Sequence, residues 1–209
     1  PEKTISTLAY QYTRTPPLTK PDSNVLITLC SIECDRSIPI SEGCKDFESD
    51  LIGWSKLTEN IRIWDYTTQF TNFLAPFPNW GTIKPNINLF VNSNAKWIFE
   101  QHSNNPSELF ELRSYLMAKL LWNPNLDSDL VIKDFTNGYY GEGGEYIVEY
   151  IEEIQNQLNI TKPFFLFLYG DPSQAFDSYL SPKNLTNYDN LYKKALLSVP
   201  KNSDYYSRI

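Results

Sequence analysis

The chain has 209 residues, and its 41% hydrophobic content is ordinary for a globular protein with a real core. Asp and Glu total 25 against 18 Lys and Arg, and the resulting net charge of −7 argues against nucleic acid or an anionic membrane surface as a partner. Because no apolar run is long enough to cross a bilayer, we also expect no membrane span.

Four short apolar runs predict buried parallel strands. They are TISTLAYQYT (4–13), NVLITLCSIEC (24–34), NIRIWDYT (60–67) and KWIFEQH (96–102). Each ends in residues that can bind a ligand, namely Tyr10 and Tyr12, then Glu33, then Asp65 and Tyr66, and finally Glu100, Gln101 and His102. A βα-barrel enzyme presents its site in this way, because the carboxyl ends of its strands open into one crevice.

The connections between these runs differ in character. Residues 13–23 hold three prolines, so we expect either an extended crossover without a helix or a different pairing of the first two strands. Residues 46–58 have the apolar spacing of a helix that covers the barrel. The aromatic segment 67–85 reads as a long loop, and 84–94 reads as a short helix with Pro85 in its first turn.

Beyond the fourth strand the pattern is mostly helical. Asp127 or Ser128 can cap one of these helices, and 163–169 is strand-like in composition. The predicted helices span 107–122, 129–140, 145–158, 171–180 and 185–199. We therefore divide the chain into a barrel part, residues 1–122, and a helical extension packed on it, residues 123–209.

Four strand units are half of an eight-stranded barrel, which typically needs roughly 250 residues. The expected fold is α/β, the C-terminal half of a (β/α)8 TIM-like barrel with about four parallel strands, followed by a helical extension. We expect the stretch to be a fragment that pairs with the missing half of the barrel or forms a homodimer, because a half-barrel has exposed edge strands.

Asp65 and Glu100 are the most informative candidates. Both follow an apolar strand and an aromatic residue, so adjacent strands would aim two carboxylates into one mouth, where they could bind sugar hydroxyls or act as general acid and base. A salt bridge or a helix cap is the structural alternative. Because side chains alternate along a strand, Trp64 and Phe99 would pack against the helices if the two acids face the crevice.

Each of the remaining candidate binding residues also has a structural alternative. Tyr10 and Tyr12 share one face of the first run, so both face the pocket or both face the helices. Glu33 could line the mouth or pair locally with Arg36. His102, the single histidine, could donate to a substrate or be an ordinary surface residue.

The three cysteines, Cys30, Cys34 and Cys44, are an odd number, so they cannot all pair within the chain. A Cys34–Cys44 disulfide is compatible with an exporting compartment, and buried thiols are the alternative. A zinc site needs four ligands and is disfavoured, and no nucleotide-binding, serine-triad or zinc-protease motif occurs. No cofactor is implied.

Sequence segments at and around the predicted strand ends resemble those of a known family. LAYQYTRTPP, LCSIEC, DLIGWSK, IWDYTTQF, FPN, IFEQ, ELRSYLMAKLLWNP and NGYYG together resemble a bacterial family of unknown function, DUF4838, found in Bacteroidetes. The resemblance covers nearly residues 5–158. It implies a glycoside-hydrolase-like barrel similar to those of family-twenty hexosaminidases and α-glucuronidases, with strands one to four before Pro1. The acid/base carboxylate would then lie outside this chain, while Asp65, Tyr66 and Glu100 would line the sugar pocket on strands seven and eight.

We therefore expect part of a secreted or periplasmic glycoside hydrolase that acts on a glycan, inactive as a fragment. Two alternatives remain. The chain could be a non-catalytic carbohydrate-binding module, or a structural domain in which the carboxylates pair with Arg14, Arg36 or Arg62.

Overall fold

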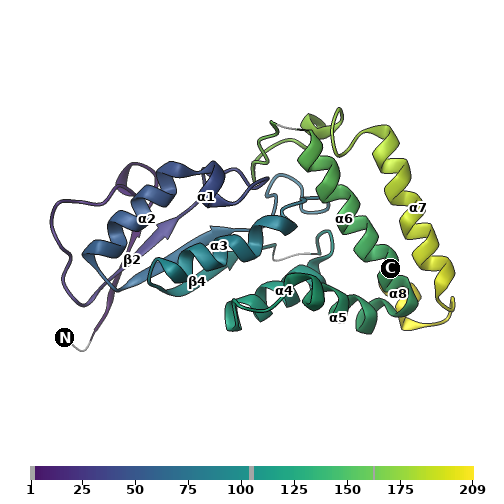
Figure 1. Ribbon diagram of the computed structural model, residues 1–209, viewed down its shortest axis with the longest axis horizontal. Coiled ribbons are helices and arrows are strands. Elements are labelled where there is room, and N and C mark those ends of the chain that lie inside the picture. The colour runs from purple at the N-terminus through teal and green to yellow at the C-terminus, as the bar shows by residue number, and fades with distance from the viewer. Residues whose placement is uncertain (1–2, 104–105, 162) are drawn as a thin grey trace.

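The computed structural model describes residues 3–103, 106–161 and 163–209. The molecule is elongated, with a sheet and its covering helices at one end and a group of helices at the other (Figure 1). Among the described residues, no helix combines the length and the apolar character that a bilayer crossing needs.

The sheet has four strands in the order β1-β2-β3-β4, and each pairs in parallel with its sequence neighbour. The strands are β1 (Ile5–Ala9), β2 (Val25–Cys30), β3 (Ile61–Tyr66) and β4 (Ala95–Gln101). The four predicted parallel strands are thus confirmed. The proline-rich link from β1 to β2 contains only a 3-10 turn, η1 (Gln11–Thr13), so the first crossover has no α-helix.

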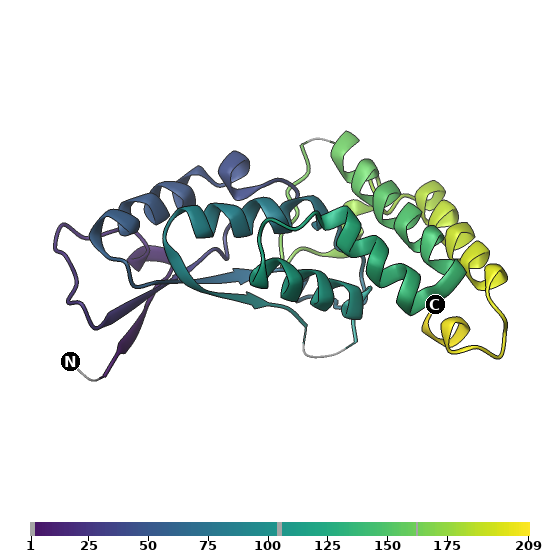
Figure 2. The same cartoon turned by 60° about the horizontal axis from the view of Figure 1, so that its bottom comes forward.

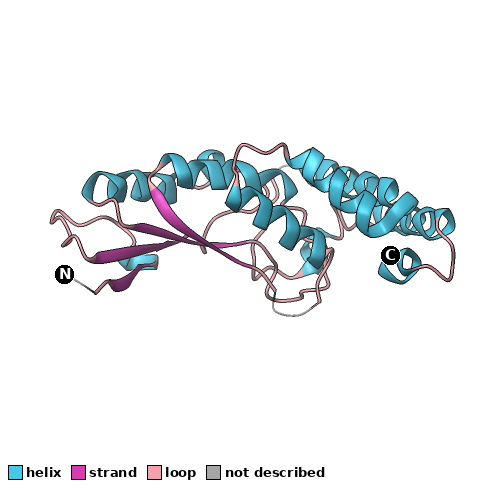
Figure 3. Cartoon of the chain, turned by 90° about the horizontal axis from the view of Figure 1, so that it is seen from below, coloured by secondary structure: helices cyan, strands magenta, loops and turns pink. Residues whose placement is uncertain are grey.

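Helices cover one face of the sheet (Figures 2 and 3). They are α1 (Ile40–Gly43), α2 (Lys45–Leu57) and α3 (Trp80–Asn92). Apolar side chains of the strands, such as Leu29, Ile61 and Ile63, pack there against Phe47 of α2 and Phe90 of α3. Removal of these apolar side chains from water is the main source of stability for this end of the molecule.

The boundaries of α3 correct the sequence prediction. The helix begins at Trp80, and Pro85 lies inside it rather than in its first turn. Trp80 and Ile83 are buried against the second group of helices, so packing extends the helix upstream of the point where proline suggested a start.

The second group of helices has its own core, which α3 also joins through Ile83 and Ile87. Its members are α4 (Phe110–Trp122), α5 (Ser128–Tyr140), the 3-10 turn η2 (Gly141–Gly143), α6 (Gly144–Ile160), α7 (Pro182–Ser198) and α8 (Asp204–Arg208). Asp127 caps α5, as predicted, by accepting hydrogen bonds from the backbone N–H groups of Asp129 and Leu130. Helices α6 and α7 lie side by side (Figure 1).

Two predicted elements differ in the link between α6 and α7. Residues 163–169 form no strand, and they end in a turn at 168–169, although hydrogen bonds hold them against the loops that follow β2 and β3. Within 171–180 only a 3-10 turn, η3 (Pro172–Ala175), replaces the predicted helix. Tyr179 and Leu180 are buried in the helical core, and the Ser181 side chain caps α7, so the chain turns there before a longer helix can form.

Candidate functional site

Asp65 and Glu100 lie side by side at the carboxyl ends of β3 and β4, directly opposite each other in the parallel register. Side-chain alternation places both on the face of Ile63 and Ile98, the face that the helices cover. Asp65 is only 2% exposed. Glu100 is half-buried as a whole, but its Oε2 atom is sealed from solvent and has no hydrogen-bond partner among the described residues. The two acids are neighbours, yet they do not open into a crevice.

Arg36, from the loop after β2, compensates the charge of Asp65. Its Nη1 donates to Asp65 Oδ1 at 2.7 Å, and its Nη2 donates to the carbonyl of Ser31 at 2.5 Å. The Ser31 hydroxyl also donates to Asp65 Oδ1. With Arg36 only 1% exposed, this is a fully buried ion pair whose remaining hydrogen bonds come from Ser31.

Arg36 hydrogen-bonds Asp65, and its charge also acts on the neighbouring Glu100 carboxyl. Burial, together with the negative charge of Asp65, raises the pKa of the Glu100 carboxyl well above its usual range, and Arg36 offsets only part of that effect. Because two ionised carboxylates in contact repel each other, the neutral form of Glu100 is the form that this environment favours.

The other face of the strands carries the aromatic residues, the reverse of the prediction that Trp64 and Phe99 would pack against the helices. The Trp64 ring meets the Phe99 ring edge-on at 5.1 Å, and Trp64 Nε1 donates to Gln101 Oε1 at 2.7 Å. Phe99 and Trp97 remain 38% and 50% exposed. The reversal arises because Arg36, from a loop distant in sequence, compensates the charge of Asp65 and so allows its burial. The pattern of the strand alone does not show this.

Tyr10, Cys30 and Tyr66 lie on this same side of the sheet beside Trp64, where Cys30 and Tyr66 are buried in one cluster with Leu168 of the 163–169 segment. Burial raises the pKa of the Cys30 thiol to about 11 and raises the pKa of Tyr66 further above its ordinary value. Cys30 is thus held as a neutral thiol, which is a poor nucleophile. The pKa of Tyr10 is also raised, by burial first and then by the charge of Glu33.

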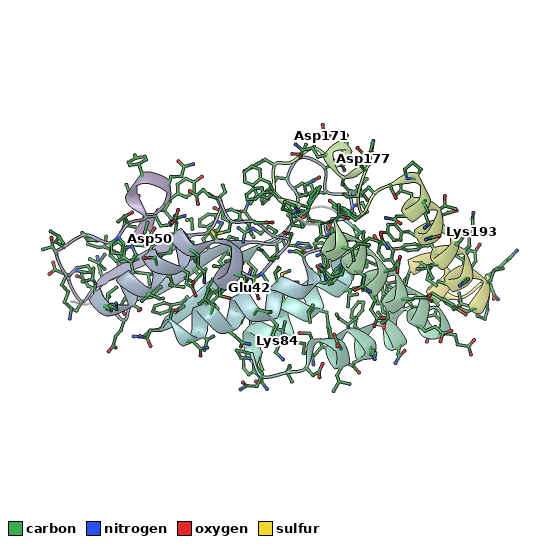
Figure 4. The ribbon with its side chains drawn as sticks, turned by 45° about the horizontal axis from the view of Figure 1, so that its top comes forward. Glu42, Asp50, Lys84, Asp171, Asp177 and Lys193 are labelled. Atoms are coloured by element: carbon green, nitrogen blue, oxygen red, sulfur yellow. A yellow bond between two sulfur atoms is a disulfide. The ribbon has the colours of Figure 1, made fainter. Side chains whose placement is uncertain are left out.

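Tyr12 and Glu33 lie apart from that cluster. β1 ends at Ala9, and Gln11 has a φ of 49°, so the strand alternation that linked Tyr10 to Tyr12 is broken and Tyr12 is 93% exposed. Glu33 accepts a hydrogen bond at 2.8 Å from Arg14, which also donates to Asp50 of α2 at 2.7 Å. The predicted alternative of a local ion pair holds for Glu33, with Arg14 in place of Arg36. Asp50 is labelled in Figure 4.

His102 lies in a different cluster. Its ring stacks on Phe110, with ring centroids 5.4 Å apart, and both of its nitrogens are buried. Burial, and then the positive charge of Arg113, lowers the pKa of His102 to about 4. Arg113 itself is paired with Glu108 at 2.7 Å, and Glu108 accepts from Tyr150 of α6 at 2.9 Å. This buried network joins the strand ends to the helical group, and strand patterns gave no sign of it.

A continuous series of aromatic contacts leads away from the open face. Tyr66 meets Phe70 at 6.2 Å, and Phe70 meets Tyr169 of the 163–169 segment at 5.6 Å. Phe70 and Tyr169 were not among the predicted site residues. The aromatic composition of 67–85 and 163–169 was the available signal, but nothing in the sequence indicated that these two segments meet.

A disulfide joins Cys34 to Cys44 and closes the loop that carries Arg36. Of the described residues, no three His, Cys, Asp or Glu side chains are grouped so that they could hold a metal ion.

Comparison with known families gives one match. The family model described as "Domain of unknown function (DUF4838)" matches residues 1–152, which include the whole sheet, α1 to α5 and half of α6. Comparison with the curated proteins and with the solved structures gives no significant match to either. Because the family model covers most of the chain, the chain belongs to the DUF4838 family.

Proposed function

We propose that this chain supplies one wall of a carbohydrate site in a glycoside-hydrolase-like (β/α)8 barrel, with the principal acid/base outside the chain. The open aromatic face at the strand carboxyl ends carries this proposal. Trp64, Phe99 and Tyr10 offer ring surfaces, and Gln101 adds an amide, which is the mixture of aromatic and placed polar groups that small-molecule sites use. Sequential parallel strands with helices on one face are also what a sector of such a barrel requires.

In this proposal Asp65 and Glu100 support the wall from behind. Both acids lie on the helix-covered face, and Asp65 pairs there with Arg36, so this group holds the strand ends in place and leaves sugar contact to the other face. Their burial favours a second candidate function, a carbohydrate-binding domain of the same fold that performs no hydrolysis. The absence of a solvent-facing carboxyl pair among the described strand ends is the observation that favours it.

Secretion to the periplasm or the cell exterior fits the Cys34–Cys44 disulfide, because disulfides persist in oxidising compartments. Carbohydrate polymers are also met there.

The test combines binding with turnover. Calorimetry with di- and hexasaccharides of β-1,4-linked glucose, xylose and N-acetylglucosamine should show binding to at least one series, and Trp64→Ala should abolish it. Trp122→Ala is the matched control, since Trp122 is exposed at the end of α4 and is not part of the open aromatic face. Because the proposed acid/base lies outside this chain, turnover is measured on the intact parent protein, where binding without release of reducing ends would select the non-catalytic function. No binding of any series would refute the carbohydrate proposal.

A further inference from the structure

The segment 163–169 has a regular two-sided arrangement. Leu166 and Leu168 are buried at 2% and 0% exposure, whereas Phe165 and Tyr169 are 58% and 55% exposed. Over residues 165–168 the side chains alternate in burial, and a turn in which the Gly170 N–H donates to the Phe167 carbonyl at 2.9 Å leaves Tyr169 exposed as well. The exposed side is aromatic at every second position, because Phe167 lies between the other two rings.

Backbone hydrogen bonds fix the segment on the strand ends. The Leu166 N–H donates to Asp35 Oδ1 at 2.9 Å, and the Leu166 carbonyl accepts from the Arg36 N–H at 2.9 Å. The Leu168 carbonyl accepts from the Phe70 N–H at 2.7 Å. The loops after β2 and β3 therefore both hold this segment, so its rings are presented by an anchored backbone.

The rings form one row that continues the proposed carbohydrate site. Phe165 and Phe167 have centroids 5.8 Å apart, Phe167 and Tyr169 5.9 Å apart, and Tyr169 reaches Phe70 at 5.6 Å. From Phe70 the contacts run through Tyr66 to the open face.

We infer that the row Phe165, Phe167 and Tyr169 is a second subsite, which binds the continuation of a neutral linear glycan whose first units occupy the open face. This inference rests on the proposed function. A single sugar covers one ring, so a row of rings suits a chain of sugars. Residues 165–170 carry no charged side chain, and the acids Asp171 and Asp177 follow the row (Figure 4), which disfavours an anionic polymer. The row lies outside residues 1–152, which the family model matches.

The test compares chain lengths. In the 209-residue chain, Phe165→Ala with Tyr169→Ala should weaken binding of the hexasaccharide on the order of tenfold and leave the disaccharide affinity unchanged. Phe176→Ala is the matched control, because Phe176 is similarly exposed just beyond the row. The conservative pair Phe165→Tyr with Tyr169→Phe should keep the hexasaccharide affinity, which separates loss of the rings from loss of folding.

Three results would overturn the inference. If the double alanine variant binds the hexasaccharide like the parent while Trp64→Ala loses both ligands, the subsite is refuted and the proposed function stands. If the unmodified chain binds none of the three oligosaccharide series, both the subsite and the proposed function are refuted. If the double variant keeps its glycan affinity but loses self-association in sedimentation, the row is a protein contact instead.

Discussion

At the scale of single residues, the distribution of charge around Arg36 decides how the strand ends are built. Asp65 pairs there with Arg36, both fully buried, and the half-buried Glu100 carboxyl lies beside Asp65. Removing one partner of such a buried pair usually destabilises a protein by about 3–5 kcal/mol, because a charge is left without compensation. When Glu100 is protonated, the positive charge of Arg36 balances the negative charge of Asp65.

Glu100→Gln should therefore make the protein more stable at neutral pH. The pKa of Glu100 is higher in the folded chain than in the unfolded chain, so the folded state binds more protons between the two values and stability falls as pH rises through that window. The gain from glutamine should be smallest below about pH 4 and grow with pH. Urea unfolding across pH measures it, and Glu152→Gln, on the exposed face of α6, is the control. A wild-type stability that rises with pH relative to the variant would contradict this.

His102 should titrate in the opposite sense. Its pKa of about 4 in the folded chain lies below the ordinary value of roughly 6.5, so its burial as a neutral ring contributes stability that is lost as pH falls from about 6.5 toward 4. His102→Gln should remove this part of the acid sensitivity. Since His102 is the only histidine, one set of imidazole NMR resonances reports the pKa directly. A midpoint near 6.5 would show that the ring is not buried.

At the scale of elements, the loop between β2 and α2 brings distant parts together. It presents Arg36 to Asp65 of β3 and Asp35 to Leu166 of the final link, and the Cys34–Cys44 disulfide restricts its freedom. The stability of the strand ends thus depends on a covalent constraint as well as on packing.

Replacing both Cys34 and Cys44 by Ser should lower the free energy of unfolding by about 2 to 3 kcal/mol, the loop-entropy term for a short disulfide loop. Differential scanning calorimetry with and without a reductant checks this. The parent and a Cys30→Ala variant should both lose stability in reductant, because Cys30 is outside the disulfide, while the double serine variant should not respond. Equal melting temperatures for all three in reductant-free buffer would argue against the constraint.

Strands and long helices were predictable because their signals are local. The apolar runs gave all four strands, and the spacing of Phe47, Leu51 and Trp54 gave α2 within a residue or two at each end. The face to which a strand turns its polar residues was not predictable. Asp65 looked like a pocket residue, and only the partner Arg36, from another loop, explains its burial.

The same limit applies to the site. Tyr10, Tyr66 and Gln101 were named from the strand ends and do share the open face, whereas the contact of Phe70 with Tyr169 joins segments about a hundred residues apart. Contacts over such separations leave no periodic trace in a sequence, so the second half of the aromatic surface became visible only in three dimensions.

At the scale of the whole molecule, the sheet has two open edges and one face without a helical layer among the described residues (Figure 3). Leu8 of β1 and Trp97 of β4 expose half of their surface there. Exposed edge strands with apolar neighbours are templates for association with another chain.

We expect the 209-residue chain to self-associate as its concentration rises, through this face and its edges. Sedimentation velocity should show a shift toward dimer, and Leu8→Lys with Trp97→Lys should return it to monomer. Trp122→Lys replaces a still more exposed tryptophan, on α4 rather than on the sheet, and should leave the dimer intact. A parent that stays monomeric at the highest attainable concentration would contradict the prediction.

The strictly sequential order of the strands bears on how the protein is made. Each strand finds its partner in the one synthesised just before it, so the sheet can grow while the ribosome is still translating. The hydrogen bond from Leu166 to Asp35 spans 131 residues and cannot form until Leu166 has left the ribosome. The contact between residues 163–169 and the loop after β2 is therefore made late, and a nascent chain halted before Leu166 would leave the strand ends exposed to chaperones and proteases.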